Sequence, residues 1–574
     1  MLIRKVLINN FRGIRQASWS LPDRRFVCLV GPGDSTKTTL LDVIGLVLSP
    51  RWNVPFTDAD FHSGNTDEPI VLQVVISDLP PRLLRDDTRG YELCGLKPNG
   101  DLTEEPEDGT ESCIMVQLKV TDALEPVWTV VRPGHEDDGG TIGGTGRADF
   151  GLFRVDEHVG THLRWGRGSA LTRLTEKGSG AQTAVTSAHR AARKAIFDAD
   201  ENALHAAAVE VAEAAAEIGG SVFEELRPGL DPTAGSTTHA LLLHDHDIPL
   251  TGYGLGTRRL VSLAIQERAF TTGEIVLVDE VEHGLEPHRL QHLLHHLKAR
   301  TAGDKGQVIL TTHSPMAVES LVAEDISVVR CTDGTTTVLP VPSTVDDVQG
   351  TLRAAPSALL AKRIAVCEGK TEIGVVRGLI HHWDAQRRPE KPSHASLGVA
   401  YGYGEGTSAP TRALVFRLLG YPTLLLVDND DPAINATVAM VTAKGGEVVR
   451  WELGHALEQE IAGALSATGL AEMVALAVEF KSDEAVLSAI KARLPGGPAL
   501  SGLDPSAWIS LGRELPAIRV AIGEAAKKKG WFKQEEPGSR LADVLVRRWE
   551  EIKNLPLGQG FRKLYQFVYG EDMP

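Results

Sequence analysis

The sequence is poor in cysteine, and the few cysteines that it has are scattered. There are five in 574 residues, and no two stand close together along the chain. They are Cys28, Cys94, Cys113, Cys331 and Cys367. This spacing argues against a disulfide framework and against a zinc site made of cysteines, and it is typical of a protein from a reducing compartment.

Long apolar runs are missing as well. The chain begins MLIRKVLINNFRGIR, without the apolar core of a signal peptide, and no run approaches the length that spans a membrane. We therefore expect a cytoplasmic protein without a membrane partner.

The chain has no excess of positive charge. Its formal net charge is −17, whereas a protein that bound nucleic acid over its whole surface would usually be basic. Any contact with DNA is therefore expected to use a local basic groove. The hydrophobic share of 42% is ordinary for a soluble globular protein, and the length predicts two to four domains, each with its own core.

The most informative stretch is LLLVDNDD, Leu424–Asp431, in which four apolar residues run directly into an acidic cluster. This pattern predicts a buried parallel strand whose acids emerge at the carboxyl end, where open α/β sheets keep their sites. If the strand continues, Asp428 and Asp430 point to one face and Asp431 to the other. Two crowded carboxylates suit a hard cation such as Mg²⁺ or Mn²⁺. A strand followed by an acidic turn is the alternative.

A glycine-rich loop, GPGDSTKTT, lies between an expected strand at Arg24–Val30 and a helical pattern at Leu40–Leu48. In this context the backbone N–H groups and the helix N-terminus cradle phosphates, the lysine reaches the β and γ oxygens, and a threonine hydroxyl holds Mg²⁺. The candidate nucleotide ligands are Gly31, Gly33, Lys37, Thr38 and Thr39, with Thr38 at the metal. Thr36 stands where the pattern wants a second glycine, which puts tight ATP binding or fast hydrolysis in question.

Three further motifs follow in the order of an ATPase. EIVLVDE, Glu274–Glu280, predicts a strand that ends in two acids; Asp279 would act through the Mg²⁺ shell and Glu280 would polarise the attacking water. His313, in TTHSP, would sense the γ-phosphate. Between the phosphate loop and these motifs lies the glycine-rich PLTGYGLGTRRL, Pro249–Leu260.

These four motifs resemble those of the ABC-type ATPase heads of the SMC and RecF families. The resemblance implies that Gly254 and Gly256 belong to a signature loop and that Val281–Pro287 is a D-loop. Because that signature acts on ATP held by a second subunit, it implies a homodimer or a higher homo-oligomer. The loop departs from LSGGQ, since it has no serine at the usual place and Thr251 is the only stand-in.

Four histidines recur at helical spacing along Pro287–Arg300, namely His288, His292, His295 and His296. No companion cysteine or acid is obvious, so a solvated helix face is favoured over a metal cluster.

A second acidic motif follows a boundary expected near Pro340–Leu360. The apolar Arg363–Cys367 leads into Glu368-Gly-Lys-Thr-Glu372, and a helix that began at the glycine would make these two acids one rim of a metal site. Together with LLLVDNDD, this motif resembles the Toprim domain of topoisomerases, DnaG-type primases and OLD-family nucleases.

That resemblance implies two Mg²⁺ or Mn²⁺ ions per site, with the ligands Glu368, Glu372, Asp428 and Asp430 and a later acid. Glu458 is the candidate for the later acid, with Glu460 close behind, and a solvated helix is the alternative for both. It also implies a late lysine near the scissile phosphate. We choose Lys533, in KKKGWFKQ, although a basic surface turn is an equal alternative.

The two halves together resemble the OLD (overcoming lysogenization defect) family and the nuclease subunit of Gabija anti-phage systems. The implied fold is α/β: an ABC-type ATPase head over 1–355 with a helical insertion at about 180–230, a Toprim domain over 360–464 and a helical region over 465–574. A packed helical hairpin is the alternative for the insertion.

The resemblance further implies an ATP-regulated, metal-dependent DNA endonuclease that binds ATP with Mg²⁺ and double-stranded DNA, acts in anti-phage defence and works with a helicase-like partner in some members. The first alternative is a DNA-binding ATPase of the RecF or SMC kind with a Toprim domain that does not cut. A topoisomerase or a primase is less favoured; a topoisomerase needs a catalytic tyrosine, and none of the seven tyrosines has a recognisable catalytic context.

Overall fold

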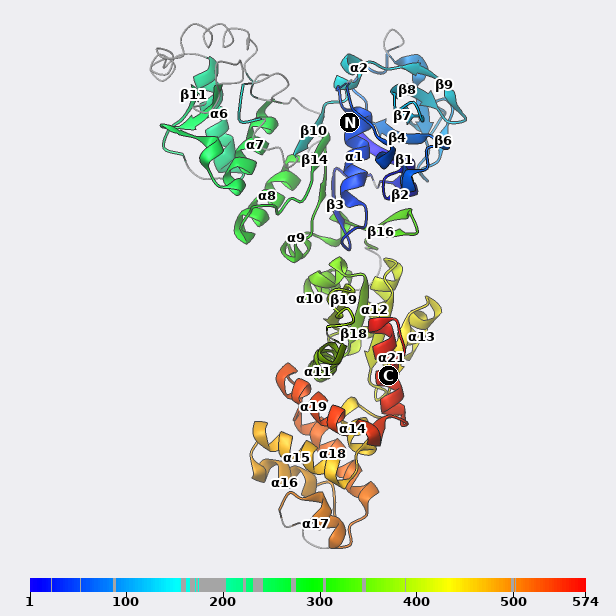
Figure 1. The fold of residues 1–574 in the computed structure, drawn as a ribbon, viewed down its shortest axis with the longest axis vertical. Helices are drawn as coiled ribbons and strands as arrows, with labels where there is room; N and C mark the ends of the chain where they lie inside the picture. The colour runs from blue at the N-terminus through cyan, green and yellow to red at the C-terminus, as the bar shows by residue number, and fades with distance from the viewer. Residues whose placement is uncertain are drawn as a thin grey trace. The chain divides into compact units, whose positions relative to one another are not determined.

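The structure is a computed structural model, and it divides into two units, Met1–Pro340 and Val341–Pro574 (Figure 1). It describes residues 1–21, 23–51, 53–85, 89–155, 162–165, 171, 174, 203–219, 223–230, 241–269, 275–302, 306–342, 347–387, 389–496, 500 and 502–573. Within these residues, no helix is long and apolar enough to cross a membrane.

The first unit is organised around one large mixed sheet, which has fourteen strands over the described residues. Five neighbouring strands at one end are parallel, in the order β10-β14-β15-β3-β16. Their bounds are Leu152–Val155, Ile275–Val278, Gln307–Thr311, Phe26–Val30 and Ile326–Thr332. Strands β14, β15 and β3 are buried along their whole length, as their nearly unbroken apolar sequences predict.

The rest of this sheet is mainly antiparallel. Its longest strands are β1 (Leu2–Phe11), β2 (Ile14–Ser20), β4 (Ile70–Ser77), β7 (Glu111–Val120) and β8 (Pro126–Arg132). Helix α1 (Lys37–Leu48) covers this part and contacts β4 and β7. The sheet continues through the short strands β5 (Cys94–Leu96) and β6 (Leu102–Thr103), while β9 (His135–Thr141) pairs with β8 and β17 (Thr335–Pro340) with β16 and β2.

Helix α7 (Leu255–Ala269) precedes β14 in the chain, α8 (Pro287–Arg300) follows it, and α9 (Pro315–Ser320) follows β15. A three-stranded sheet of β11 (Leu226–Leu230), β12 (Leu241–Asp245) and β13 (Ile248–Pro249) lies beside α6 (Ala203–Glu217). Of the helical insertion expected at about 180–230, residues 180–202 and 220–222 lie outside the described part. Helix α6 is helical as expected, but Leu226–Leu230 is strand β11, because it pairs with β12. The histidines on α8 lie on its solvated side, with three exposed and His296 half-buried.

The second unit contains a four-stranded parallel sheet in the order β19-β18-β20-β21. The strands are Val399–Tyr403, Arg363–Cys367, Thr423–Val427 and Glu447–Arg450, and they are connected by α11 (Lys370–Arg387), α12 (Ala409–Leu418) and α13 (Asn435–Ala443). Strands β18 and β20 are neighbours in space, although about 55 residues of chain separate them.

The rest of this unit is helical. Helix α10 (Val348–Ala354) precedes the sheet, and the helices that follow it are α14 (Leu457–Ala464), α15 (Ala467–Phe480), α16 (Asp483–Lys491), α17 (Pro505–Ser510), α18 (Leu515–Lys529), α19 (Glu535–Arg547), α20 (Trp549–Ile552) and α21 (Pro556–Tyr569). One apolar core joins them to the sheet, because α19 packs along α11 and α21 contacts β21. The predicted α/β class with a helical C-terminal region is confirmed.

One local expectation needs correction. The strand at LLLVDNDD ends at Val427, so Asp428, Asp430 and Asp431 belong to the loop that follows it. The alternation of strand faces therefore does not assign their directions. Asp431 instead accepts a hydrogen bond from the Ala433 N–H (2.8 Å) at the start of a short 3-10 turn.

Candidate functional site

The carboxyl ends of three adjacent parallel strands bring the nucleotide motifs of the first unit together. Strand β3 leads into the phosphate loop, β14 into Asp279 and Glu280, and β15 into His313. Since the carboxyl ends of neighbouring parallel strands share one sheet edge, motifs up to about 280 residues apart meet there.

The phosphate loop has the backbone shape that its sequence requires. Thr36 is left-handed (φ 68°, ψ 18°), the conformation that a glycine adopts easily and that costs another residue about 1 kcal/mol. Its hydroxyl lies 2.9 Å from Thr336 Oγ1. A Cβ at Gly31 would lie 2.3 Å from the Val329 carbonyl oxygen, so a side chain does not fit there, whereas Gly33 has open space. The threonine therefore takes the glycine shape at an energetic cost.

Lys37 is buried at the start of α1, and its ammonium points back over the loop. Nζ donates hydrogen bonds to the carbonyl oxygens of Gly31 (3.1 Å) and Pro32 (2.7 Å) and to Ser35 Oγ (3.1 Å). Burial lowers the pKa of Lys37 to about 8, against the opposing effect of nearby acids, of which Asp279 is the strongest. The position suits a lysine that reaches phosphate oxygens, while Thr39 follows it in the first turn of the helix.

Asp279 connects the phosphate loop to the neighbouring strand. Its carboxylate accepts hydrogen bonds from the hydroxyls of Thr38 (3.2 Å) and Thr311 (2.6 Å). A threonine hydroxyl beside a strand-end aspartate is the pair that holds Mg²⁺ in P-loop NTPases, so these residues fit ATP with its metal. Glu280 has a positive φ of 44°, and its N–H donates to Thr311 Oγ1 (2.8 Å), which fixes the strained turn.

Glu282 is a residue that the sequence analysis missed. Its carboxylate accepts hydrogen bonds from the Thr312 hydroxyl (2.7 Å) and the His313 N–H (2.6 Å), and so it holds the loop after β15 in place. Partial burial, helped by the Lys37 charge, lowers the pKa of His313. The lowered pKa favours the neutral imidazole beside the phosphate loop.

Gly254 and Gly256 stand at the start of α7, and their surroundings differ. A Cβ at Gly256 would lie 2.2 Å from the Gly284 carbonyl oxygen, whereas Gly254 has open space. Gly256 therefore lets α7 approach the turn after β14, a contact within one chain. The role of both glycines at the nucleotide of a second subunit stays a prediction.

In the second unit, the ends of β18 and β20 carry the predicted acids. The Asp428 N–H donates a hydrogen bond to Glu368 Oε2 (2.7 Å). This bond joins the residue that follows β20 to the residue that follows β18. Glu372 lies in the first turn of α11, and its Oε2 accepts from the Gly369 N–H (2.7 Å). The motif begins a helix at the glycine, as its spacing predicts.

Helix α14 supplies the later acid. Glu458 is 3% exposed, and its Oε1 accepts a hydrogen bond from the Thr371 hydroxyl (3.1 Å). The preceding Leu457 N–H donates to Asp428 Oδ1 (3.0 Å). The start of α14 is therefore attached to the acidic motif of β18 and to that of β20.

These carboxylates disturb one another electrostatically. Burial, followed by the charge of Glu458, raises the pKa of Glu372 from its ordinary value near 4.5 to about 8. Burial, followed by the charges of Glu372, Glu368, Glu458 and Asp430, raises the pKa of Asp428 to about 9. Burial also raises the pKa values of Glu368 and Glu458. Crowded oxygen donors that resist ionisation on their own fit a hard divalent cation, which would restore their charged forms.

Two lysines lie at the same site. The charges of the predicted Lys533 and of the unpredicted Lys527 partly oppose the rise in the pKa of Glu458 that burial causes. Lys527, at the end of α18, forms an ion pair with Asp430 and also partly opposes the rise in the pKa of Glu368. The run of basic residues was visible in the sequence, but only the packing of α18 identifies Lys527 as a member of the site.

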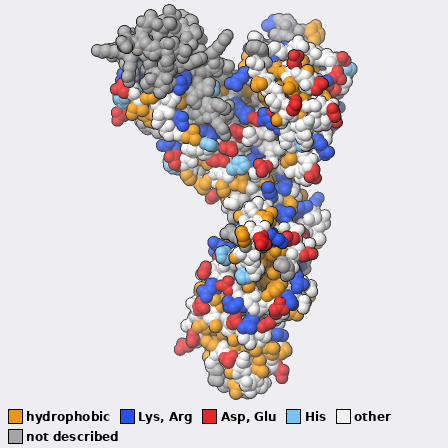
Figure 2. Space-filling model, viewed as in Figure 1, with side chains coloured by type: hydrophobic (Ala, Val, Ile, Leu, Met, Phe, Trp, Pro, Cys, Tyr) orange, Lys and Arg blue, Asp and Glu red, His pale blue; other side chains and the backbone are white. Residues whose placement is uncertain are grey.

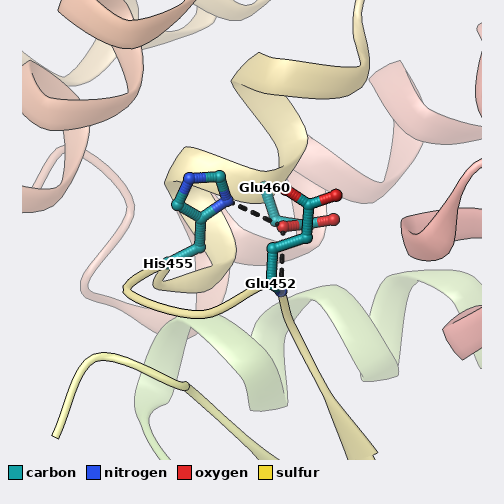
Figure 3. A group of neighbouring side chains, drawn as sticks. All are labelled: Glu452, His455 and Glu460. Carbon is teal, nitrogen blue, oxygen red and sulfur yellow. Dashed lines mark hydrogen bonds and ion pairs between the residues drawn. The ribbon is translucent and has the colours of Figure 1, made fainter.

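Glu460, the second candidate for the later acid, lies in a different group. Its Oε2 accepts from His455 Nδ1 (3.0 Å) and from the Glu452 N–H (3.3 Å), and Figure 3 shows the two glutamates and the histidine converging. Their ligand atoms lie within 4.8 Å of one another, a separation that a metal ion could bridge. Within the chain, the group fixes the turn before α14, which is also attached by the Asn429 N–H bond to the His455 carbonyl (3.0 Å).

Charge on the outer surface is mixed. In the face shown in Figure 2, Lys and Arg side chains of the second unit are interspersed with Asp and Glu side chains. Lys527 and Lys533 form a local pair of basic residues at the acidic site.

Comparison with known proteins places an ATPase similarity in the first unit. Residues 161–319 match the family model described as "AAA domain, putative AbiEii toxin, Type IV TA system". This match includes Asp279, Glu280 and His313, and together with the phosphate loop it supports an ATP-binding, ATPase-like domain. A search of the curated proteins finds no match.

Three solved structures similar to this chain are SMC heads. One bound to the C-terminal winged-helix domain of ScpA is 13% identical, covers 60% of this chain and 98% of its own, and has a TM-score of 0.37. The SMC head from Thermotoga maritima is 13% identical, with coverages of 60% and 100% and a TM-score of 0.29. A Pyrococcus furiosus head with an extended coiled coil, bound to the C-terminal domain of ScpA, is 12% identical, with coverages of 59% and 95% and a TM-score of 0.38.

Proposed function

We propose that this protein is an ATP-regulated, divalent-metal-dependent DNA endonuclease. The observation that carries the proposal is the convergence of the acids after β18, after β20 and at the start of α14, with two lysines beside them. These acids are Glu368, Glu372, Asp428, Asp430 and Glu458. Burying so much like charge is unfavourable unless a ligand compensates it, and the Toprim resemblance of the two motifs names that ligand as a pair of Mg²⁺ or Mn²⁺ ions.

The carboxylates and the lysines of this site would have different chemical roles. The carboxylates would hold the cations, which supply Lewis-acid stabilisation of charge on the phosphoryl group and favour ionisation of water. Lys527 and Lys533 are placed to neutralise charge on a phosphodiester near Asp430 and Glu458. Thr371 and the Leu457 N–H hold Glu458 and Asp428 in fixed orientations.

The nucleotide site provides the control. Lys37, Thr38 and Asp279 would bind ATP with Mg²⁺, Glu280 would polarise water, and nucleotide-dependent pairing of two such heads would alter access of DNA to the acids. The resemblance to the OLD family and to Gabija nucleases extends the proposal to a role in anti-phage defence. A homodimer and a helicase-like partner belong to the same proposal, and a helicase in the neighbouring open reading frame would support the latter.

Cleavage of supercoiled plasmid tests the proposal. The natural protein should nick or cut the plasmid in Mg²⁺ or Mn²⁺ but not in EDTA, and ATP should change the rate. Asp428→Asn should lower the rate by about 100-fold or more, because it removes a buried ligand charge.

Asp431→Asn is the matched control. Asp431 makes the same type of turn contact that asparagine can make, so this variant should cut like the natural protein. If the natural protein never cuts, or if Asp428→Asn cuts equally well, the nuclease assignment is wrong. DNA binding with ATP turnover but no cleavage would favour the alternative, a RecF- or SMC-like ATPase.

A further inference from the structure

Two cysteines that are far apart in the sequence lie face to face in the first unit. Cys94 on β5 and Cys113 on β7 are directly opposite in antiparallel register, and their Sγ atoms are 3.2 Å apart. The scattered cysteines therefore include a close pair, which corrects the expectation from spacing alone. The pairing of the two strands, rather than any local motif, creates it.

The pair is enclosed in apolar surroundings. Both cysteines are fully buried, in a small cluster with Val75, Met115 and Val131. Each thiol also points to the backbone of the other residue, since Cys94 Sγ lies 3.4 Å from the Cys113 carbonyl oxygen and Cys113 Sγ lies 3.3 Å from the Cys94 carbonyl oxygen. Each thiol thus has the other cysteine as its polar partner.

We propose that Cys94 and Cys113 form a redox modification site, at which the two thiols are converted reversibly into an intrachain disulfide. Opposite residues of an antiparallel pair have Cα atoms about 4.5–5.5 Å apart, which lies within the range of disulfides. The sulfur atoms need to approach by only about 1 Å to reach bonding distance. The opposite strand positions and the short sulfur–sulfur distance therefore favour this bond.

The oxidant would be a small disulfide of the glutathione class. The Cys94 thiolate attacks that disulfide and releases one thiol, and the Cys113 thiolate then attacks the Cys94 sulfur and releases the second. Two protein thiols and one small disulfide give one protein disulfide and two small thiols, so electrons and protons balance. The hydrogen bond from Cys113 lowers the pKa of Cys94, which favours Cys94 as the first nucleophile.

Access to the buried pair follows from its place in the sheet. Strand β5 has three residues and β6 has two, and they stand at the end of the strand order next to β7. So short a segment can open locally at a low cost compared with global unfolding. By contrast, Cys28 and Cys367 lie fully buried inside parallel strands. Burial raises the pKa of both thiols, and the contact with Cys94 together with burial raises that of Cys113 as well, so only Cys94 has a lowered pKa among these four.

The disulfide would have a physical consequence for this end of the sheet. It would attach β5 to β7 covalently, so local opening of β5 would be restrained. Backbone amides of Cys94–Leu96 are expected to exchange hydrogen at least about tenfold more slowly after oxidation, and reductant should reverse the change.

Thiol mapping on the full-length protein tests the proposal. The reduced protein is incubated with oxidised glutathione, blocked with an alkylating reagent in denaturant, digested and analysed by mass spectrometry. We expect a peptide pair linked through Cys94 and Cys113, and an intact protein that is lighter by about 2 Da when it is weighed before alkylation. Cys94→Ser and Cys113→Ser should each abolish the link, whereas Cys331→Ser, at a partly exposed site, should retain it.

The outcomes separate clearly. Glutathione adducts on single cysteines without the 94–113 link would overturn the proposal, as would two thiols that stay unmodified in oxidised glutathione. Hydrogen exchange on the natural protein gives a second measurement that does not depend on the serine variants folding. Equal exchange at Cys94–Leu96 before and after oxidation would also overturn it. Neither measurement involves DNA cleavage, so the result is independent of the proposed nuclease function.

Discussion

At the scale of single residues, Glu372 combines a structural cost with a proposed function. Its pKa is raised to about 8 by burial and then by the charge of Glu458, so between about pH 4.5 and 8 the folded protein holds a proton that the unfolded chain has lost. The free energy of unfolding of the metal-free protein should therefore fall as pH rises through this window. Asp428, with its pKa raised to about 9, adds to the same trend.

Glu372→Gln should remove part of this penalty. In EDTA at pH 8 the variant is expected to melt at a higher temperature than the natural protein, and its stability should depend less on pH between 5 and 8. Mn²⁺ should stabilise the natural protein more than the variant. Thermal unfolding followed by circular dichroism measures all three effects.

A matched control for Glu372→Gln is Glu390→Gln, the same change at an exposed residue of the same unit. It should leave the pH dependence as it is. A natural protein whose stability rises from pH 5 to 8 in EDTA would contradict the buried-carboxylate argument.

Thr36 illustrates a different residue-scale effect. The sequence analysis questioned the phosphate loop because glycine is missing there, and the structure shows the threonine in a left-handed conformation. The departure from the motif is therefore accommodated by backbone strain and by the hydroxyl contact with Thr336, rather than by a different loop path.

At the scale of elements, the acidic site depends on the close approach of α11 and α19. A Cβ at Gly374, two residues after Glu372, would lie 2.5 Å from the Glu535 carbonyl oxygen and 2.8 Å from Gly538 Cα. Helix α19 begins two residues after Lys533. The spacing of these helices thus affects the position of an acid and of a lysine together.

Gly374→Ala should force the two helices apart. We expect a loss of about 1–3 kcal/mol in the free energy of unfolding and a lower rate of DNA cleavage. Urea denaturation and plasmid cleavage measure the two effects. Gly463→Ala, on α14, is the control, because a Cβ there meets nothing within 4 Å and alanine favours a helix. Equal stability of the two variants would show that α11 and α19 tolerate separation.

The strands explain how much of the site could be predicted. Buried parallel strands carry a continuous apolar signal, so Glu368 and Asp428 could be placed at strand ends from the sequence. Lys527, Glu282 and the Cys94–Cys113 pair could not be found in this way, since their partners are distant in the chain and depend on tertiary packing. The extended backbone assumed through Asp430 was wrong, because the acidic residues follow the apolar run without a glycine or proline to mark the end of the strand.

At the scale of the whole molecule, two units with their own cores carry two separate sites. If ATP bound to the first unit controls cleavage by the second, a substitution in the first unit should abolish the effect of ATP on the cleavage rate without abolishing cleavage. Lys37→Ala removes the buried ammonium of the phosphate loop and should abolish ATP binding. The variant should still cut plasmid in Mg²⁺, at a rate that ATP no longer changes.

The control for Lys37→Ala is Lys97→Ala, at an exposed lysine of the same unit, which should keep the full ATP effect. Fluorescent-nucleotide binding and plasmid cleavage with and without ATP measure the two properties. An unchanged ATP effect in Lys37→Ala would show that regulation does not pass through this loop.

The crossover topology of β18, β20 and β21 also means that the second unit can be divided into two fragments, each with part of the proposed acidic site. The turn at Gly445 and Gly446 lies between α13 and β21. A chain opened there would leave Glu368, Glu372, Asp428 and Asp430 on one piece. Glu458, Lys527 and Lys533 would be on the other. Neither fragment alone could form the proposed acidic site. Recovery of DNA cleavage on mixing the two fragments would therefore report that β21 has paired with β20.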